Sequence, residues 1–460
     1  MTERVDVVVI GLGVGGEAVA GDLATAGLTV VGIENRLVGG ECPYWGCVPT
    51  KMMTRAAGLL AEARRIPGMA GTSSVTPDWT PVAQRIRKEA TDNWDDRVAV
   101  ERFEKKGGHF IRGAGKLAGP GRVEVDGVTY EASRAVVLST GTSAVIPPIP
   151  GLTDVAYWTN REAIEVEQLP ASLAVLGGGA IGLELAQVYA RFGVQVTIIE
   201  GMDHVLAIEE PEAGAVLAEV LQRDGIELCL NAKTQAVRKE GSSTIAITLD
   251  GGRQVNAERL LVATGRRANL KDLGLETIGL DPSARSIEVD PQLRAADGLW
   301  AVGDITGKGA FTHVAIYQAA IAVRDVLGKP GPGADYSALP RVTFTDPEVG
   351  AAGITEATAR KQGINVKTGL QKASVTSRGW IFGPGNDGFI KVVLDADRGT
   401  IVGATSMGPR GGDILGIFEL AIRARIPAEE LNHLIYAYPT FYRGVGEAIA
   451  SAIGEHEHLR

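Results

Sequence analysis

The chain has 460 residues, of which 60 are glycine and only 5% are aromatic, and its formal net charge is −9. This length exceeds what a single hydrophobic core can organise, so we expect two to four domains. The negative charge argues against nucleic acid or an anionic membrane as the main partner, and no apolar run is long enough to span a bilayer.

The first predicted element is a strand from Val5 to Ile10, which the chain enters directly from Met1-Thr2-Glu3-Arg4. This start lacks the pattern of a signal peptide, so we expect a cytoplasmic protein. The strand leads into the glycine-rich loop Gly11-Leu12-Gly13-Val14-Gly15-Gly16, then a helix, and then a second strand that ends at Glu34. This order of strand, loop, helix, strand and acid is typical of a dinucleotide-binding unit.

The residue types of this loop fit the chemistry of a dinucleotide. Gly11 would make the tight turn, Gly13 would let the backbone approach a pyrophosphate, and Gly16 would let the helix pack on the strand. The helix N-terminus would hold the phosphates, and Glu34 would accept hydrogen bonds from ribose hydroxyls.

Two cysteines follow shortly after this loop, in Gly39-Gly40-Glu41-Cys42-Pro43-Tyr44-Trp45-Gly46-Cys47-Val48-Pro49-Thr50-Lys51. Pro49 suits the first turn of a helix, which would place Cys47 near a helix N-terminus that stabilises the thiolate. Lys51 would add a positive charge one helical turn after Cys47. A structural pair is one alternative, and a zinc site is disfavoured because no two further ligands have matching spacing. We predict a disulfide that breaks and reforms in use, and no metal site.

The nucleotide-binding pattern returns downstream. The strand 174–176 leads into Gly177-Gly178-Gly179-Ala180-Ile181-Gly182, then a helix, and then the strand 195–199 with Glu200 at its end. In both copies the acid stands 23 residues after the first glycine. Gly177, Gly179 and Gly182 therefore correspond to the three glycines of the first loop, and the chain is expected to have two dinucleotide sites.

Glu200 also predicts which nicotinamide nucleotide is used. A carboxylate at the end of this strand would repel a 2′-phosphate, which favours NADH over NADPH. Arg191 and His204 stay open as groups that could still reach a phosphate.

Several further segments are predicted to end the nucleotide-binding domains or to link them. The apolar strands before Thr140-Gly141 and before Gly265 each break into a glycine turn and are expected to close one nucleotide domain, so these three residues are candidate cofactor-binding residues. The proline-rich segment 147–151 is a stiff linker, and the strand 299–302 ends at Gly303-Asp304.

The remainder of the chain predicts one more domain. An apolar helix is expected from about Ala315 to Leu327, and the glycine- and proline-rich stretch 328–340 marks a boundary. Beyond it, strands at 389–394 and 400–406 with two helices indicate an α+β domain.

Three other residue groups are assigned no chemistry. Cys229 is expected to be a buried core thiol, and His313, just before the apolar helix, to be structural or adjacent to a cofactor. His456 and His458 are expected in a frayed tail.

Taken together, these motifs resemble those of the pyridine nucleotide–disulfide oxidoreductases, which include dihydrolipoamide dehydrogenase, glutathione reductase and mercuric reductase. The resemblance covers essentially the whole chain. It implies FAD on the first loop, with Glu34 on its adenosine ribose and Asp304 near its ribitol and pyrophosphate, and NAD(P)H on the second loop. It also implies that Cys42 is the interchange thiol that attacks substrate and Cys47 the charge-transfer thiol. Lys51 and Glu184 match the ion pair beside the flavin.

The resemblance also implies the fold class and the order of domains. We expect an α/β protein with two Rossmann-like dinucleotide-binding domains and a C-terminal α+β dimerisation domain, assembled as a homodimer. The predicted boundaries are 1–150 for the first part of the FAD domain, 151–270 for the NAD(P) domain, 271–335 for the second part of the FAD domain and 336–460 for the dimerisation domain.

The chain departs from the family pattern in two places. Pro43-Tyr44-Trp45-Gly46 replaces the usual Leu-Asn-Val-Gly type of stretch between the cysteines. Tyr438 stands where the family has the histidine that supplies a base to the partner subunit's active site, and Arg443 stands at the position of that histidine's glutamate. A C-terminal cysteine pair, as in mercuric reductases, is absent from the sequence.

Three functions are therefore weighed. The leading hypothesis is an FAD enzyme that passes a hydride from NAD(P)H to flavin and then reduces the Cys42–Cys47 disulfide, which reduces a small acceptor that does not need the usual base. The first alternative sends electrons directly from flavin to quinones, metal ions or oxygen. The second is a redox sensor, which is disfavoured because the sequence shows no DNA-binding or effector module.

Overall fold

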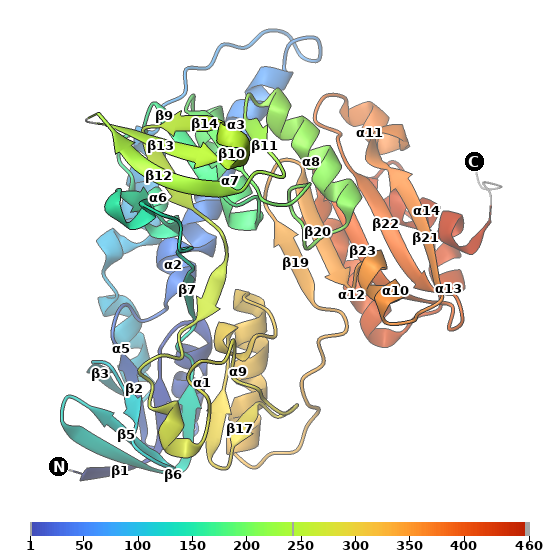
Figure 1. Cartoon of the computed structure of the whole chain (residues 1–460). Coiled ribbons are helices and arrows are strands. Elements are labelled where there is room, and N and C mark those ends of the chain that lie inside the picture. Colours follow the sequence, from blue (N-terminus) through green and yellow to red (C-terminus); the bar gives the residue numbers. More distant parts are fainter. Residues whose placement is uncertain (1, 242, 456–460) are drawn as a thin grey trace. The chain divides into compact units, whose positions relative to one another are not determined.

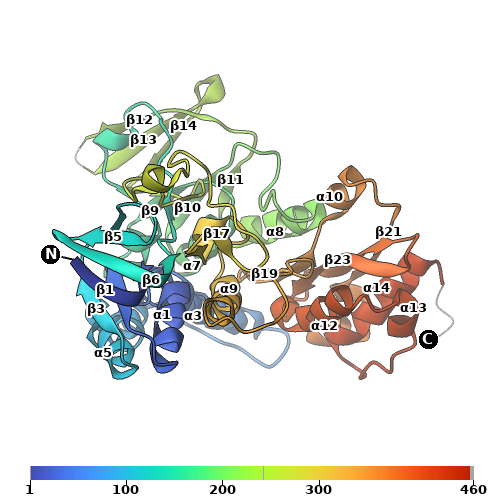
Figure 2. The same cartoon turned by 90° about the horizontal axis from the view of Figure 1, so that it is seen from below.

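The chain forms two compact units, each made of three segments, in a computed structural model that describes residues 2–241 and 243–455 (Figures 1 and 2). The first unit contains residues 1–49, 83–145 and 265–335, and the second contains residues 50–82, 146–264 and 336–460. The predicted tail histidines His456 and His458 lie outside the described residues. Within the described ranges, no helix combines the length and the apolar character needed to cross a membrane.

The first unit is built on a mostly parallel sheet in the order β17-β18-β6-β1-β2-β3, with β4 and β5 attached through β6. Its strands are β1 (Thr2–Ile10), β2 (Val30–Glu34), β3 (His109–Arg112), β4 (Lys116–Leu117), β5 (Arg122–Val125), β6 (Val128–Leu138), β17 (Arg294–Ala296) and β18 (Leu299–Ala301). A separate ribbon pairs β7 (Thr142–Ala144) with β16 (Arg266–Ala268). Parallel strands with covering helices are the expected dinucleotide-binding architecture.

The alternation of side chains along β1 creates a core on each face of this sheet. Val7 and Val9 belong to one apolar cluster, and Val8 and Ile10 belong to the other. The helices of this unit are α1 (Val14–Thr25), α2 (Glu41–Trp45), α5 (Arg97–Lys105) and α9 (Thr312–Val326). Because β1 is paired with parallel strands on both sides, its carboxyl end at Ile10 opens onto the loop that begins at Gly11.

The helix predicted from about Ala315 starts earlier than expected. It begins at Thr312, so His313 lies inside its first turn and not before it, and that part of the prediction is wrong. The apolar pattern starts only at Val314, because the two residues that precede it in the helix are polar and half-buried or exposed.

The second unit contains three sheets. A five-stranded parallel sheet, β11-β10-β9-β15-β8, carries the second nucleotide loop, and a three-stranded antiparallel sheet, β12-β13-β14, packs with it in one core. The strands are β8 (Tyr157–Trp158), β9 (Ser172–Leu176), β10 (Gln195–Ile199), β11 (Glu227–Cys229), β12 (Thr234–Glu240), β13 (Thr244–Leu249), β14 (Gln254–Ala257) and β15 (Arg259–Val262). Cys229 is 3% exposed and packs in this core, as predicted.

The third sheet of this unit is antiparallel, in the order β19-β20-β23-β22-β21, and its helices cover an apolar core of their own. The strands are β19 (Pro340–Thr343), β20 (Glu348–Gly353), β21 (Val366–Lys372), β22 (Phe389–Asp395) and β23 (Thr400–Gly408). The helices of the second unit include α6 (Asn160–Glu165), α7 (Ala180–Arg191), α8 (Pro211–Arg223), α10 (Glu356–Lys361), α11 (Ser377–Phe382), α12 (Gly411–Ala424), α13 (Ala428–Asn432) and α14 (Gly444–Ile453). The boundary between the units falls within α3 (Cys47–Arg65) and within α4 (Thr80–Arg85). The α+β C-terminal domain predicted from the sequence is present.

Candidate active site

The two predicted nucleotide loops have the same backbone construction. Gly11 and Gly177 open them with φ angles of +90° and +108°, which favour glycine. A Cβ atom at Gly16 would collide with the carbonyl oxygen of Gly11, and one at Gly182 would collide with that of Gly177. The first and third glycines of each loop are therefore required by the turn and by the close packing of helix on strand.

The middle glycine of each loop leaves open space. A Cβ atom built at Gly13 or at Gly179 meets no described atom within 4 Å. These positions lie at the N-caps of α1 and α7, where backbone N–H groups and the helix dipole favour an anion. The residues present thus fit a dinucleotide pyrophosphate in both units.

The two acids that end the second strand of each nucleotide unit also hold equivalent positions. Glu34 accepts hydrogen bonds from the N–H groups of Leu12 and Arg36, both at 2.8 Å. Glu200 accepts the corresponding bonds from Gly178 at 2.6 Å and Met202 at 2.8 Å. Each carboxylate is therefore fixed against its own glycine loop, where the ribose of a bound dinucleotide is expected.

The cysteine segment is attached to the first nucleotide loop by two glycines. The N–H of Gly39 donates to the carbonyl of Leu12 at 2.7 Å, and Gly39 forms a parallel bridge with Gly13. A Cβ atom at Gly40 would lie 2.8 Å from the Cα of Gly13, closer than real Cβ contacts. Only glycine allows this approach, and the chain enters α2 directly after it.

Both cysteines lie on the helices that follow. Cys42 is half-buried in the first turn of α2, and Cys47 is exposed and is the first residue of the 19-residue helix α3. The Sγ of Cys47 lies 3.4 Å from the Oγ1 of Thr312, the first residue of α9. A thiol at the start of a long helix is in the setting that favours its thiolate.

The aromatic residue Tyr44, between the two cysteines, is part of the core. It is 6% exposed, and burial, together with the negative charges of Asp96 and Glu17, raises the pKa of Tyr44 to about 12. Its ring lies 5.8 Å from that of Trp45. Tyr44 thus stays protonated at neutral pH and serves packing.

Asp304 belongs to a polar network in the first unit. Its Oδ2 accepts a hydrogen bond from the Thr142 hydroxyl at 2.7 Å, and that hydroxyl accepts one from Arg266 Nε at 2.8 Å. Arg266 also lies 3.6 Å from a carboxylate oxygen of Glu41. Burial raises the pKa of Asp304 above its usual value, while the Thr142 hydrogen bond and the charge of Arg266 act to lower it. Gly303 is fixed by its N–H, which donates to Gln318 at 2.6 Å.

The turn containing Thr140 and Gly141 faces the segment after Gly265. The Thr140 hydroxyl donates to the carbonyl of Asn269, and the Asn269 amide donates to the carbonyl of Thr140, both at 2.9 Å. Gly141 has a φ of +65° and Gly265 a φ of +127°. These hydrogen bonds bring together two segments that are 129 residues apart in the sequence, where the sequence predicted only two separate closures.

The predicted ion pair between Lys51 and Glu184 is present in the second unit. Lys51 Nζ lies 2.7 Å from Glu184 Oε2, and it stands 4.4 Å from the ring centroid of Phe344. The other oxygen of Glu184 accepts a hydrogen bond from the N–H of Phe344 at 2.8 Å.

Tyr438 and Arg443 also contact each other in the second unit. The guanidinium of Arg443 lies over the ring of Tyr438, 5.7 Å from its centroid, and Tyr438 is 67% exposed. Arg443 is also 3.7 Å from Glu447. As residue types, a tyrosine hydroxyl and a guanidinium do not replace an imidazole as a proton carrier.

Arg191 does not have the accessibility that would let it reach a 2′-phosphate, so this alternative is wrong. It is 2% exposed, and its guanidinium lies 2.9 Å from Asp224 and 2.9 Å from Asp346. The sequence places Arg191 in the last turn of a nucleotide-binding helix but does not show which partners bury it. His204 lies 2.5 Å from Asp203.

One cluster of acids has the spacing of metal ligands but holds a lysine. Glu210, Glu212 and Glu356 converge, and Lys391 Nζ lies 2.7–2.9 Å from all three. Burial acts to lower the pKa of Lys391, but the three carboxylates raise it well above its usual value. The ammonium compensates the negative charges there, so we assign this cluster a structural role.

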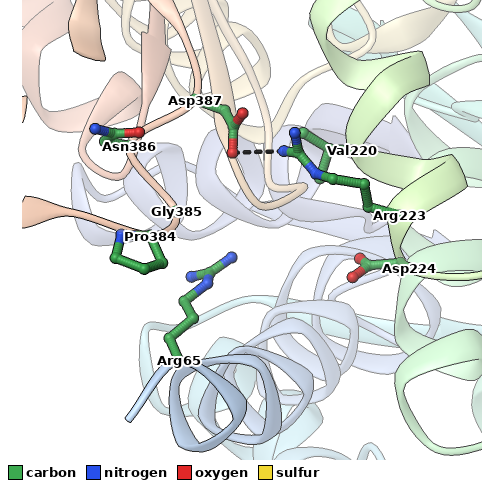
Figure 3. Close-up of a pocket in the computed structure, with 8 residues that line it drawn as sticks. All are labelled: Arg65, Val220, Arg223, Asp224, Pro384, Gly385, Asn386 and Asp387. Atoms are coloured by element: carbon green, nitrogen blue, oxygen red, sulfur yellow. Dashed lines mark ion pairs between the residues drawn. The ribbon is translucent and has the colours of Figure 1, made fainter. Parts of the chain in front are cut away.

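A cavity of about 380 Å³ lies in the second unit, and none of the residues that line it is a predicted site residue (Figure 3). It is lined by Arg65, Val220, Arg223, Asp224, Pro384, Gly385, Asn386 and Asp387. Arg223 pairs with Asp387 at 2.6 Å, and Arg65 pairs with Asp346 at 2.7 Å. Because its charges are already paired, this cavity is not assigned to the acceptor.

Sequence reasoning missed several residues that the structure places beside predicted ones. Thr142 and Arg266 contact each other and connect to Asp304, Thr312 contacts Cys47, and Phe344 contacts the Lys51–Glu184 pair. Arg266 directly follows the glycine turn at 265, which was a usable signal. Thr142, Thr312 and Phe344 have no local motif, because their hydrogen-bond partners are 160 to 265 residues away in the sequence.

Comparison with known proteins finds matches over almost the whole chain. A family described as pyridine nucleotide-disulphide oxidoreductase matches residues 5–319, and its dimerisation domain matches residues 339–449. The chain is 32% identical to a dihydrolipoyl dehydrogenase of Thermus scotoductus, over 99% of the chain and 98% of that protein. It is 29% identical to a mercuric reductase of Bacillus cereus, over 96% of the chain and 71% of that protein.

Solved structures show the same likeness. The Cu(II) complex of the HOCl-induced flavoprotein disulfide reductase RclA from Escherichia coli has a TM-score of 0.84 and 25% identity, covering 96% of this chain and 99% of RclA. LpdA from Mycobacterium tuberculosis has a TM-score of 0.84 and 27% identity, covering 97% and 99%. The chain therefore belongs to the pyridine nucleotide-disulphide oxidoreductase family, and it is an oxidoreductase that uses FAD and NAD(P)H.

Proposed function

We propose that this protein is a homodimeric, NADH-dependent reductase that delivers electrons through the Cys42–Cys47 pair to a small acceptor. The observation that carries the proposal is the attachment of the cysteine segment to the first nucleotide loop through Gly39 and Gly40. Bound FAD would supply the two-electron carrier between NADH and the sulfur pair. A cytoplasmic location, expected from the sequence, is part of this proposal.

Each cysteine has a distinct task in this proposal. Cys47, at the start of α3, is the thiol whose negative charge the helix N-terminus stabilises. Cys42, half-buried on α2, is the thiol that attacks the acceptor. Lys51 and Glu184, which are 2.7 Å apart, are proposed to provide the charge pair beside the flavin.

The domain boundaries are proposed as predicted from the sequence. The assignment of 271–335 to the FAD domain is supported by β17 and β18, which join the sheet that contains β1. The division at 150 is supported by the parallel sheet of the second unit, whose strands fall between residues 157 and 262. Homodimer formation is supported by the match of residues 339–449 to a dimerisation domain.

The acceptor is proposed to be one that needs no protonated thiol leaving group. Tyr438 stands at the position expected for the histidine and contacts Arg443, and neither residue type supplies a base as an imidazole does. Quinones and thiophilic metal ions fit this requirement. This same observation favours a second candidate, in which electrons pass from the flavin to the acceptor directly and the thiols are peripheral.

Anaerobic reduction with NADH should expose two new thiols per subunit. The reason is that a disulfide between Cys42 and Cys47 would be reduced through the flavin, whereas Cys229 is buried and unreactive. The measurement is thiol titration of the purified holoenzyme before and after NADH, with a long-wavelength absorbance band as the sign of a thiolate against oxidised flavin. An unchanged thiol count would contradict the leading proposal and favour the second candidate, in which electrons pass directly from the flavin to the acceptor.

NADH should be preferred to NADPH by roughly 5- to 150-fold in kcat/KM. This corresponds to about 1–3 kcal/mol of repulsion between Glu200 and a 2′-phosphate. Glu200 is held against the second loop by two backbone N–H groups, and Arg191 is engaged by two aspartates. Steady-state rates with both nucleotides test the ratio, and Glu200→Gln should narrow it. A preference for NADPH would show that another cation reaches the phosphate.

A further inference from the structure

Lys51 is held by two different groups of the second unit. Its ammonium lies 2.7 Å from Glu184 Oε2 and 4.4 Å from the ring centroid of Phe344. Phe344 in turn donates its backbone N–H to the other oxygen of Glu184 at 2.8 Å. Phe344 therefore touches both members of the ion pair, the lysine through its ring and the glutamate through its backbone.

The segment that carries Phe344 is fixed by one face of α7. Glu184, Gln187 and Arg191 follow the spacing of a single helical face, and each is at most 5% exposed. Gln187 accepts the N–H of Asp346 at 2.8 Å and donates to its carbonyl at 2.9 Å, while Arg191 lies 2.9 Å from its carboxylate. Side chains of α7 thus hydrogen-bond two N–H groups and one carbonyl of the backbone at 344–346. These bonds fix the position of the backbone that carries the Phe344 ring.

A second arginine adds to this attachment. Arg65, at the end of α3, lies 2.7 Å from Asp346, so the helix that contains Lys51 is tied to the same segment at its far end. The Asp346 carboxylate therefore holds both Arg65 and Arg191. These contacts fix the position of segment 344–346, which carries the ring that Lys51 contacts.

A lysine side chain needs such a support. The side chain of Lys51 is 33% exposed, whereas that of Glu184 is 7% exposed, so only the carboxylate is held firmly by burial. Lysine is a flexible stem with three rotatable donors, and one ion pair leaves it several rotamers. The Thr50 hydroxyl, 3.3 Å from Lys51 Nζ, and the face of Phe344 are the other groups that restrict it.

We propose that Phe344 is a positioning residue, which holds the Lys51 ammonium on Glu184 by a cation–π contact. The inference rests on the proposed function, because it gives Lys51 a role beside the redox centre. It also assigns a part in that centre to a residue from the stretch that matches the dimerisation domain. Glu184 contacts the ammonium directly, whereas the Asp346 carboxylate pairs with Arg65 and Arg191.

The test compares Phe344→Leu with Phe344→Tyr in the holoenzyme. Leucine keeps the backbone N–H and removes the aromatic ring, whereas tyrosine keeps the ring and should preserve the cation–π contact with Lys51. Labelling of Lys51 by acetic anhydride, read by mass spectrometry and normalised to the exposed Lys105, should rise about 2- to 5-fold in Phe344→Leu and stay at the wild-type level in Phe344→Tyr. Phe382→Leu, which removes a ring packed on Phe441 at 5.5 Å, is the matched control and should leave Lys51 labelling unchanged.

The second readout is steady-state turnover with NADH and a quinone. In Phe344→Leu, kcat should fall while the KM for NADH changes less than about twofold, and Phe344→Tyr should restore kcat. The proposal would be overturned if Lys51 labelling is unchanged in Phe344→Leu, or if it is the same in Phe344→Leu and Phe382→Leu. Altered labelling in Phe344→Leu with an unchanged kcat would also overturn it. Labelling of Lys51 does not depend on the thiols, so it can also be measured in variants that carry Cys42→Ser. A failure of the thiol pathway is therefore distinguishable from a failure of this inference.

Discussion

Cys42→Ser should lose turnover of the acceptor by roughly 10⁴-fold or more, the order seen when the nucleophile of a covalent mechanism is removed. A serine hydroxyl cannot form a disulfide and is a far weaker nucleophile near neutral pH than a thiol, which is partly ionised there. FAD content should stay at the wild-type level, because the cofactor loop is built from Gly11, Gly13 and Gly16 and not from the thiol. The measurement is NADH oxidation with each of several acceptors, beside a stopped-flow record of flavin reduction.

Cys229→Ser is the matched control for this loss. Cys229 is 3% exposed, and burial raises the pKa of its thiol, so it is unreactive and its replacement should leave turnover near the wild-type rate. If Cys42→Ser keeps most of its turnover with quinones, the thiols are peripheral for that acceptor, and direct transfer from the flavin replaces our leading proposal.

Oxidation of dihydrolipoamide and reduction of glutathione disulfide should both be slow, about 10²- to 10⁴-fold below the rate of flavin reduction by NADH. In thiol–disulfide exchange the leaving thiolate must be protonated, and general acid–base catalysis supplies a factor of that size. A histidine with a pKa near 6.5 could serve at neutral pH, but the corresponding position holds Tyr438, with Arg443 over its ring at 5.7 Å. Quinones and thiophilic metal ions should be less affected. The measurement is steady-state turnover with dihydrolipoamide and NAD⁺.

The double variant Tyr438→His with Arg443→Glu should raise lipoamide activity, because it restores a base and the carboxylate that orients it. Tyr438→Phe is the control, since it keeps the ring beneath Arg443 and removes only the hydroxyl; its lipoamide rate should stay as low as that of the wild type. Wild-type rates of hundreds per second with dihydrolipoamide would show that another group supplies the proton, and our interpretation of the C-terminal segment would then be wrong.

The sequence by itself determined the features whose cause is local. The two glycine loops could be predicted because a tight turn, a close helix–strand contact and an open middle position each demand glycine at a fixed spacing, and the structure has all three in both copies. The start of α3 at Cys47 followed from Pro49 in its first turn, and the burial of Cys229 followed from its strand. The spacing of Glu34 and Glu200 from their loops was enough to place both acids against them.

Only the tertiary structure decided which distant residues meet. Thr142 reaches Asp304 across 162 residues, and Phe344 reaches Glu184 across 160, through contacts that no periodic pattern encodes. Arg191 shows the same limit from the other side: its position on a nucleotide-binding helix suggested a phosphate contact, yet Asp224 and Asp346 bury it. A charge on a helix face has no defined partner until other segments pack against that face, because pairing depends on distances of a few ångströms that only the complete fold sets.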